Sequence, residues 1–343
     1  MSSQKKISIH LNSNKPESFE NFINSIKSTA SNIENIEILV SIDKNDLNMI
    51  KIIKKHNDNK NFIRYIETSL IKSFADAWKP LNILLSKTSD SVLFISCVSD
   101  DLRFVTKKWD EIIMSYNHYY DDDLFRIRCS KYKHEKYLDI WECGYKPDSY
   151  AFYTKKWLDI VGQWNPCIGP DSFQECVSFY MSKYGENYKR NIVNDEIEFK
   201  GEEVSTSLSF KDRIGRTRIY YKAFFILMSY KIQKIANDSA FRIISKINNN
   251  NNINNNNNIT LNRFQIYLTN FSRRLDFFYH RGSPNHVINT KSKNIIFMIW
   301  CYLNFLDNVI VKIITYLYKK NYLKKIIKDQ KKLKKIEKII NNE

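Results

Sequence analysis

The sequence predicts an α/β fold in which a mainly parallel sheet carries helices on both faces. Two observations lead to this class. Strand-like and helix-like segments alternate from residue 7 to residue 114, which is typical of consecutive βα units. Two of the strand-like segments also end in acidic residues, at the carboxyl edge where open α/β sheets bind their ligands. The same pattern therefore indicates both an architecture and the place of a site.

The first 114 residues contain regularly spaced elements. Apolar side chains recur at helical spacing in the segment after the first strand, at Phe19, Phe22, Ile23 and Ile26. The other elements follow from apolar runs of strand length and from similar helical spacing. We expect strands at residues 7–11, 36–42, 62–66 and 91–98, and helices at residues 16–28, 47–56 and 73–85.

The next hundred residues are less regular. Apolar and aromatic stretches predict strands at residues 124–128 and 137–141, and residues 150–162 predict a strand that enters a helix ending at Gly162. A loop containing Asn165-Pro166 and Gly169-Pro170 then leads to a helix at residues 172–184. This loop delivers Asp171 to the start of that helix.

An acidic pair follows the fourth predicted strand. Asp100 and Asp101 come directly after the apolar run at residues 91–98, and unpaired carboxylates are costly to place near a core. Hard oxygen ligands suit Mg²⁺ or Mn²⁺, which is usually held by one or two carboxylates together with substrate phosphates. The pair therefore indicates a metal-diphosphate site, and a solvated acidic turn is the alternative.

The order of these motifs resembles the GT-A fold of family 2-type glycosyltransferases. A second strand closing on Asp43, a further βα unit, and an apolar strand followed by Ser99-Asp100-Asp101 match the family over roughly residues 5 to 210, and Trp109-Asp110 resembles a subset of its members. The resemblance implies that Asp43 recognises the nucleotide base, that Asp101 binds Mn²⁺ or Mg²⁺ directly, and that Asp100 faces the ribose or a metal-bound water. Asp43 could also be a simple turn residue.

The resemblance also implies a general base late in this domain. In inverting GT-A enzymes a carboxylate in this region deprotonates the acceptor hydroxyl. Asp171 is the first candidate, and Glu175, one helical turn later, is the second. Asp171 could instead cap its helix.

Completion of the diphosphate site departs from the family pattern. No His lies between His134 and His280. Arg213 and Arg216 are candidates for donor binding, with Arg218 beside them, because guanidinium pairs well with phosphate oxygens. A solvated basic face is the alternative for these arginines.

Composition and charge divide the chain. The six cysteines form no Cys-x-x-Cys pair, and the start of the chain lacks an apolar leader, so we expect a cytoplasmic protein.

Residues 1–210 hold 28 Lys+Arg and 30 Asp+Glu, a net charge of −2, whereas residues 211–343 hold 26 Lys+Arg and 7 Asp+Glu, a net charge of +19. We expect a GT-A domain at residues 1–215, a helical extension at 216–247, an Asn-rich low-complexity linker at 248–258 and a basic helical region at 259–343.

The basic region suggests contact with a membrane surface. Residues 294–318 are the most apolar stretch, but Asn304, Asp307 and Lys312 interrupt them, so we expect an interfacial or packed helix instead of a spanning one. Residues 319–340 form a basic amphipathic pattern that suits an anionic membrane surface. A coiled coil or a solvated helix is the alternative.

Taken together, the residues and the resemblance predict a metal-dependent glycosyltransferase, and the resemblance implies that it is inverting. It would move a sugar from a nucleotide-sugar donor to a hydroxyl on a glycan or lipid-linked acceptor, in surface glycan or lipopolysaccharide-type assembly, and its tail would dock it peripherally on the membrane. The alternative is a basic protein that binds nucleic acid or a membrane surface without catalysis. The slightly acidic first 210 residues argue against a nucleic-acid partner.

Overall fold

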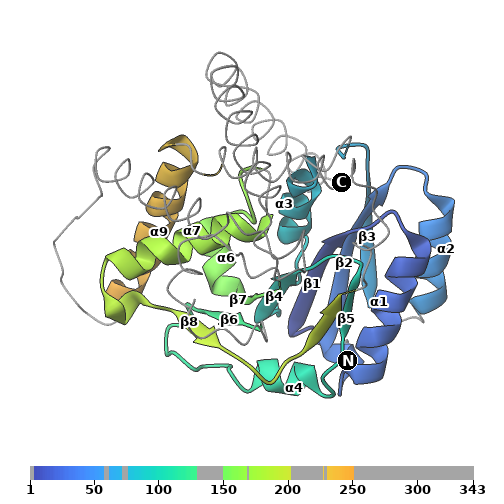
Figure 1. The fold of residues 1–343 in the computed structure, drawn as a ribbon, viewed down its shortest axis with the longest axis horizontal. Coiled ribbons are helices and arrows are strands. Elements are labelled where there is room, and N and C mark those ends of the chain that lie inside the picture. Colours follow the sequence, from blue (N-terminus) through green and yellow to red (C-terminus); the bar gives the residue numbers. More distant parts are fainter. Residues whose placement is uncertain are drawn as a thin grey trace, which may run out of the picture. The chain divides into compact units, whose positions relative to one another are not determined.

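The structure, a computed structural model, describes residues 4–57, 62–71, 76–129, 150–167, 170–201, 227 and 230–250. Residues 1–266 form one compact unit and residues 267–343 form another. The described part lies within the first unit and contains a seven-stranded, largely parallel sheet with helices on both faces (Figure 1). This confirms the predicted fold class. The predicted strand at 137–141 and the basic region at 259–343 lie outside the described residues.

The sheet has the strand order β3-β2-β1-β4-β7-β6-β8. Strands β3, β2, β1 and β4 pair with one another in parallel, β7 is antiparallel to both β4 and β6, and β8 is parallel to β6. Two further strands, β5 and β9, pair in a separate antiparallel ribbon. The strand bounds are β1 (Ile7–Asn12), β2 (Ile36–Asp43), β3 (Ile63–Thr68), β4 (Phe94–Cys97), β5 (Leu102–Phe104), β6 (Arg126–Arg128), β7 (Phe152–Thr154), β8 (Asn191–Val193) and β9 (Phe199–Gly201).

Strand β1, in the interior of the sheet, has one apolar face and one polar face. Its odd-numbered residues Ile7, Ile9 and Leu11 are fully buried in the main hydrophobic cluster, because successive side chains of a strand point to opposite faces. Helices α1 (Pro16–Thr29), α2 (Leu47–His56) and α4 (Trp109–Met114) contribute to the same cluster. Helix α3 (Trp78–Ser86) packs against β1 and β2 on the other face, where the β1 residues are polar.

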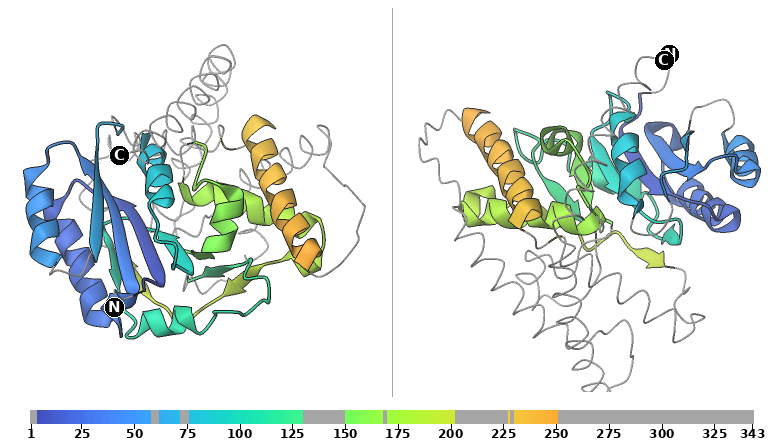
Figure 2. Two further views of the ribbon diagram at one scale, coloured as in Figure 1. Left: turned by 180° about the vertical axis from the view of Figure 1, so that it is seen from behind. Right: turned by 90° about the horizontal axis from the view of Figure 1, so that it is seen from above.

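Helix α9 (Tyr230–Asn250) packs against α6 (Lys155–Val161) and α7 (Pro170–Lys183), as Figure 2 shows. Three tyrosine hydroxyls donate hydrogen bonds to it: Tyr180 to Gln233 at 2.9 Å, Tyr184 to Asn237 at 3.1 Å and Tyr188 to Asn248 at 2.9 Å. Since α9 continues to Asn250, the first three residues of the predicted linker at 248–258 are helical.

Several element boundaries follow from local rules. Pro16 occupies the first turn of α1, where its missing N–H has no intrahelical partner to lose. The side chain of Asp46 accepts a hydrogen bond from the Met49 N–H at 3.0 Å and caps α2. Helix α6 ends at Gly162, which adopts a left-handed φ of 75°, as predicted. Two short 3₁₀ helices, η1 (Ile33–Asn35) and η4 (Glu186–Tyr188), complete the described elements.

The differences from the predicted elements are small in the first half of the chain. Strand β4 covers only Phe94–Cys97 of the predicted 91–98, and α3 begins at Trp78. The predicted helices 16–28 and 47–56 match α1 and α2. Strands β5, β8 and β9 were not predicted, because three-residue segments are too short to show a period in sequence.

A buried histidine links β1 to two later segments. Trp164 donates its indole N–H to Nδ1 of His10 at 2.9 Å, and Nε2 lies 3.0 Å from the Ser8 hydroxyl and 3.1 Å from the Thr88 hydroxyl. Because Nδ1 accepts, the neutral ring carries its proton on Nε2. Burial, with a smaller contribution from the Arg64 charge, lowers the pKa of His10 to about 3.

We predict that His10 makes the protein less stable as the pH falls from about 6.5 towards 3. The unfolded chain takes up this proton near pH 6.5 and the folded chain only near pH 3, so the unfolding free energy declines by up to about 1.4 kcal/mol per pH unit in this window. Urea unfolding at several pH values between 7 and 5 would measure the slope. His10→Gln should flatten it, whereas the exposed-site control His118→Gln should not.

Candidate active site

The acidic turn, residues 99–101, joins β4 to β5 at the carboxyl edge of β4. It closes through a hydrogen bond from the Leu102 N–H to the Ser99 carbonyl at 3.2 Å. Ser13, which directly follows β1, donates its hydroxyl to Oδ2 of Asp100 at 2.6 Å. Burial raises the pKa of the half-buried Asp100, while the Ser13 hydrogen bond and the Lys15 charge oppose this shift. Asp100 is therefore a partly desolvated carboxylate beside the loop that follows β1.

The second carboxylate of the acidic turn is held within the turn itself. The Ser99 hydroxyl donates a short hydrogen bond to Oδ1 of Asp101. Neighbouring Asp100 and Asp101 supply hard oxygen donors, which suits Mn²⁺ or Mg²⁺. No group of three or more His, Cys, Asp or Glu side chains that could hold a metal occurs among the described residues. The two carboxylates fit a cation that obtains its other ligands from substrate phosphates and water.

Asp43 ends β2, next to the loop that follows β1. Asn14 donates its side-chain N–H to Oδ2 of Asp43 at 3.4 Å. Consecutive residues of one loop thus contact two of the predicted site carboxylates, since Ser13 contacts Asp100 and Asn14 contacts Asp43. We call residues 13–15 the bridging loop. The structure brings these two predicted residues to one edge of the sheet, as the parallel strand order requires.

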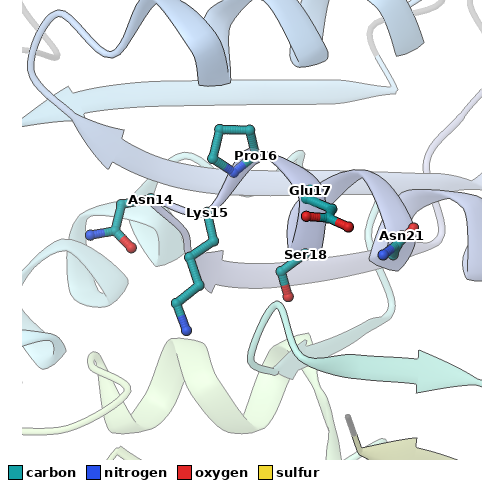
Figure 3. A pocket seen from close by; sticks show the side chains of 6 residues that line it. All are labelled: Asn14, Lys15, Pro16, Glu17, Ser18 and Asn21. Carbon is teal, nitrogen blue, oxygen red and sulfur yellow. The ribbon is translucent and has the colours of Figure 1, made fainter. Parts of the chain in front are cut away.

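A cavity of about 540 Å³ lies where the bridging loop enters α1. Figure 3 shows the side chains of Lys15 and Ser18 extending to the same side of this segment, opposite the Pro16 ring. Ser18 donates its hydroxyl to the backbone carbonyl of Asp100 at 2.9 Å, so the cavity adjoins the acidic turn. Its lining residues are Asn14, Lys15, Pro16, Glu17, Ser18 and Asn21.

Sequence reasoning did not identify Ser13, Asn14, Lys15 or Ser18. The available signal was the Lys15-Pro16 step, which marks a turn from a strand into a helix. Such loops at the carboxyl edge of a parallel sheet line ligand sites. The contacts of Ser13, Asn14 and Ser18 with Asp43 and Asp100 depend on the strand order, and the local sequence pattern does not predict that order.

The two candidate bases lie in α7 with very different surroundings. The backbone of Asp171 belongs to the first turn of α7, within the helix, although the helix was predicted to begin at residue 172. Glu175 is fully buried, and Arg126 donates to both of its oxygens, at 2.6 and 2.8 Å. A carboxylate with both oxygens paired in the core cannot reach an acceptor hydroxyl. We therefore do not retain Glu175 as a candidate base.

The Arg126–Glu175 ion pair is a structural feature of the core. Burial alone would lower the pKa of Arg126, but the Glu175 carboxylate raises it above its usual value. Asn191 on β8 accepts a further short hydrogen bond from Nε of Arg126. The pair therefore ties β6, α7 and β8 together.

Trp109 and Asp110, at the start of α4, contribute to the packing of the fold. Trp109 is fully buried and its ring centroid lies 4.3 Å from that of Phe104. Asp110 is buried and accepts hydrogen bonds from the backbone N–H groups of Ser31 at 2.7 Å and Asn32 at 2.9 Å. These residues fix the start of α4 against the segment after α1. Arg213, Arg216 and Arg218 lie outside the described residues.

The comparisons with known proteins support the fold. No protein-family model matches the chain, and no curated protein matches it. Among solved structures, it is similar to the mannosyltransferase PcManGT from Pyrobaculum calidifontis, in complex with GDP-Man and Mn²⁺, at 12% identity and a TM-score of 0.51, over 88% of this chain and 87% of that one. TarS 1–349 from S. aureus with UDP-GlcNAc matches at 13% identity and a TM-score of 0.46, over 82% of each chain.

The likeness to the mannosyltransferase shows that this chain has a GT-A-type fold. The largely parallel seven-stranded sheet flanked by helices agrees with this fold class. Within the part of the chain that the structure describes, no helix is both long and apolar enough to span a bilayer.

We predict that Glu175→Gln destabilises the fold strongly. The change leaves the buried Arg126 charge without its counter-ion, which typically costs about 3–5 kcal/mol. Urea unfolding would measure this loss. Asp238→Asn is the matched control, because its ion pair with Lys234 is half exposed and is worth under about 1 kcal/mol. Equal stability of the two variants would contradict a structural role for the pair.

Proposed function

We propose that this protein is a glycosyltransferase that moves a sugar from a nucleotide-sugar donor to a hydroxyl acceptor, with the help of Mn²⁺ or Mg²⁺. One observation carries the proposal: the bridging loop connects Asp43 and Asp100 at the carboxyl edge of a GT-A-type sheet. This edge is where such sheets bind nucleotides. A nucleotide-sugar donor bound here would find Asp43, a hydrogen-bond acceptor for its base, at one end. It would find the Asp100 and Asp101 carboxylates at the other.

The acidic turn would hold the cation and the diphosphate end of the donor. Asp101 is the proposed direct ligand, and Asp100 faces the ribose or a water bound to the ion. When bound, the cation neutralises the negative charge that develops on the diphosphate as it leaves. Arg213 and Arg216 are proposed to contact the same diphosphate.

Asp43 is proposed to read the nucleotide base. Its carboxylate can accept a hydrogen bond from a base N–H, and Asn14 holds Oδ2 from one side. The preceding β2 segment is buried, so the position of Asp43 at the strand end is well defined.

The remaining step is proton removal from the acceptor. We propose Asp171 as the general base, in the first turn of α7. As the acceptor oxygen forms its bond to the anomeric carbon, its proton passes to Asp171 and the bond from that carbon to the diphosphate oxygen breaks. Attack opposite the leaving group inverts the anomeric centre. The products are the glycosylated acceptor and the nucleoside diphosphate.

The charge of the C-terminal part of the chain bears on the acceptor and on the cellular site. The concentration of positive charge in residues 211–343 supports a cytoplasmic enzyme docked peripherally on an anionic membrane. A glycan or lipid-linked acceptor of surface glycan or lipopolysaccharide-type assembly would be found there. No observation among the described residues favours the nucleic-acid alternative.

We expect nucleotide sugars to stabilise the protein in the presence of Mn²⁺, and Asp101→Asn to abolish the effect. A donor at 100 times its Kd raises the unfolding free energy by about 2.7 kcal/mol. A thermal-shift screen of nucleotide sugars with and without Mn²⁺ would measure it. Asp100→Asn should retain more of the Mn²⁺-dependent shift than Asp101→Asn.

Two results would contradict these assignments. Equal donor affinity of the wild type and Asp101→Asn, measured calorimetrically with Mn²⁺ present, would contradict the assignment of the direct ligand. A screen in which no nucleotide sugar shifts the wild-type melting temperature would contradict the proposed function itself.

We expect Asp171→Asn to lower turnover by roughly 10² or more while donor affinity stays nearly constant, because a general base acts in the transition state. Initial rates with a donor found in the thermal-shift screen, together with calorimetric donor binding, would separate the two quantities. Glu175→Gln serves as the comparison variant. Its activity should fall only in proportion to the fraction of the protein that is unfolded. Near-normal turnover in Asp171→Asn would exclude this base.

A further inference from the structure

We propose that Ser13 is a positioning residue for the cation site, because it holds one oxygen of Asp100 and thereby fixes the direction of the other. The inference rests on the proposed function, since it concerns the cation that the acidic turn would bind. It adds a residue from the opposite side of the site, 87 positions away in sequence.

The Ser13 hydroxyl has a defined direction. Ser13 is 6% exposed, and its backbone N–H donates to the carbonyl of Ser41 at 3.0 Å, which ties it to β2. Its oxygen lies 3.4 Å from the Lys15 N–H, a contact at the long end of the hydrogen-bond range, and its own proton goes to Asp100 at 2.6 Å. A hydroxyl has a single proton to donate. The proton is therefore committed to Asp100.

Asp100 is held at its backbone as well as at its carboxylate. The Ser18 hydroxyl donates to its carbonyl at 2.9 Å, and the Arg103 guanidinium donates to the same carbonyl at 2.8 Å. With Oδ2 bound by Ser13, the χ angles of Asp100 are constrained from both ends. Within the described part of the chain, no other residue donates a hydrogen bond to Oδ1 of Asp100. That oxygen is the one available to a cation, its water or the donor.

Each of the two carboxylates of the acidic turn thus accepts a hydrogen bond from a serine hydroxyl, but the two serines come from different segments. Ser99 holds Oδ1 of Asp101 from within the turn, and Ser13 holds Oδ2 of Asp100 from across the sheet edge. Each serine occupies one oxygen and leaves the other. Hydrogen-bonded partners of this kind orient metal ligands, and their loss typically costs 10–100-fold in metal affinity or activity.

The test is calorimetric titration of MnCl₂ into the full chain at saturating GDP, and in a second series at saturating UDP. Ser13→Ala removes the hydroxyl and keeps the backbone bond to Ser41. We expect about 10-fold weaker Mn²⁺ binding, with GDP or UDP affinity in the absence of metal unchanged. Ser28→Ala is the matched control, because the exposed Ser28 hydroxyl of α1 donates only to the Ser25 carbonyl, at 3.1 Å. It should bind Mn²⁺ like the wild type.

Ser13→Cys provides a second variant of similar shape, with a weak donor in place of the hydroxyl. Its Mn²⁺ affinity should lie between those of the wild type and Ser13→Ala. Wild-type Mn²⁺ affinity in Ser13→Ala would overturn the inference and leave the proposed function intact. Equal weakening of metal-free nucleotide binding would also overturn it, since the effect would then be a general distortion. Absence of Mn²⁺ binding by the wild type in both series would overturn the proposed function and this inference with it.

Discussion

The parallel pairing of β1 with β2 on one side and β4 on the other determines where the candidate site lies. The register places Asn12 beside Ser41 and His10 beside Cys97. As a result, the chain leaving β1 has the end of β2 and the acidic turn as its immediate neighbours. A change of that pairing would separate Asp43 from Asp100, whatever their side chains. The site is therefore a property of the strand order as much as of its carboxylates.

Two carboxylates among the described residues, Glu175 and Asp100, differ in how their charge is stabilised. Arg126 and Glu175 are fully buried and satisfy one another, which fits a role in fixing the core. Asp100 is only partly buried, its pKa is raised by burial, and its hydrogen-bond donor is a neutral hydroxyl. A carboxylate that is partly desolvated but lacks a full counter-ion gains most from a bound cation. This contrast separates the carboxylate proposed to lie at the cation site from the one that supports the fold.

The sequence indicated the carboxylates and missed the loop that connects them, for a physical reason. Asp43, Asp100 and Asp101 follow apolar runs, so strand length and polarity suffice to locate them. Ser13 and Asn14 act through contacts 87 and 29 positions away. No local periodicity encodes such contacts, and only the three-dimensional pairing of β1 reveals them.

Glu175 illustrates the opposite error. Helical spacing correctly placed Glu175 one turn after Asp171, but it could not tell how much of α7 is covered. Every residue from 173 to 181 is buried, because α9 packs along α7 from more than 50 positions away, as the Tyr180–Gln233 hydrogen bond shows. A helix covered by a distant partner lacks the polar stripe that would identify its exposed side.

The placement of β1 also has a consequence for synthesis on the ribosome. The first strand made, β1, lies in the interior of the sheet, and its two neighbours are completed only at Asp43 and Cys97. The edge of β1 that pairs with β4 therefore stays unpaired until Cys97 has been made. Contacts of such high sequence separation form late and leave nascent chains open to association. The pairing of β1 with β4 can therefore form only after about a hundred residues have been translated.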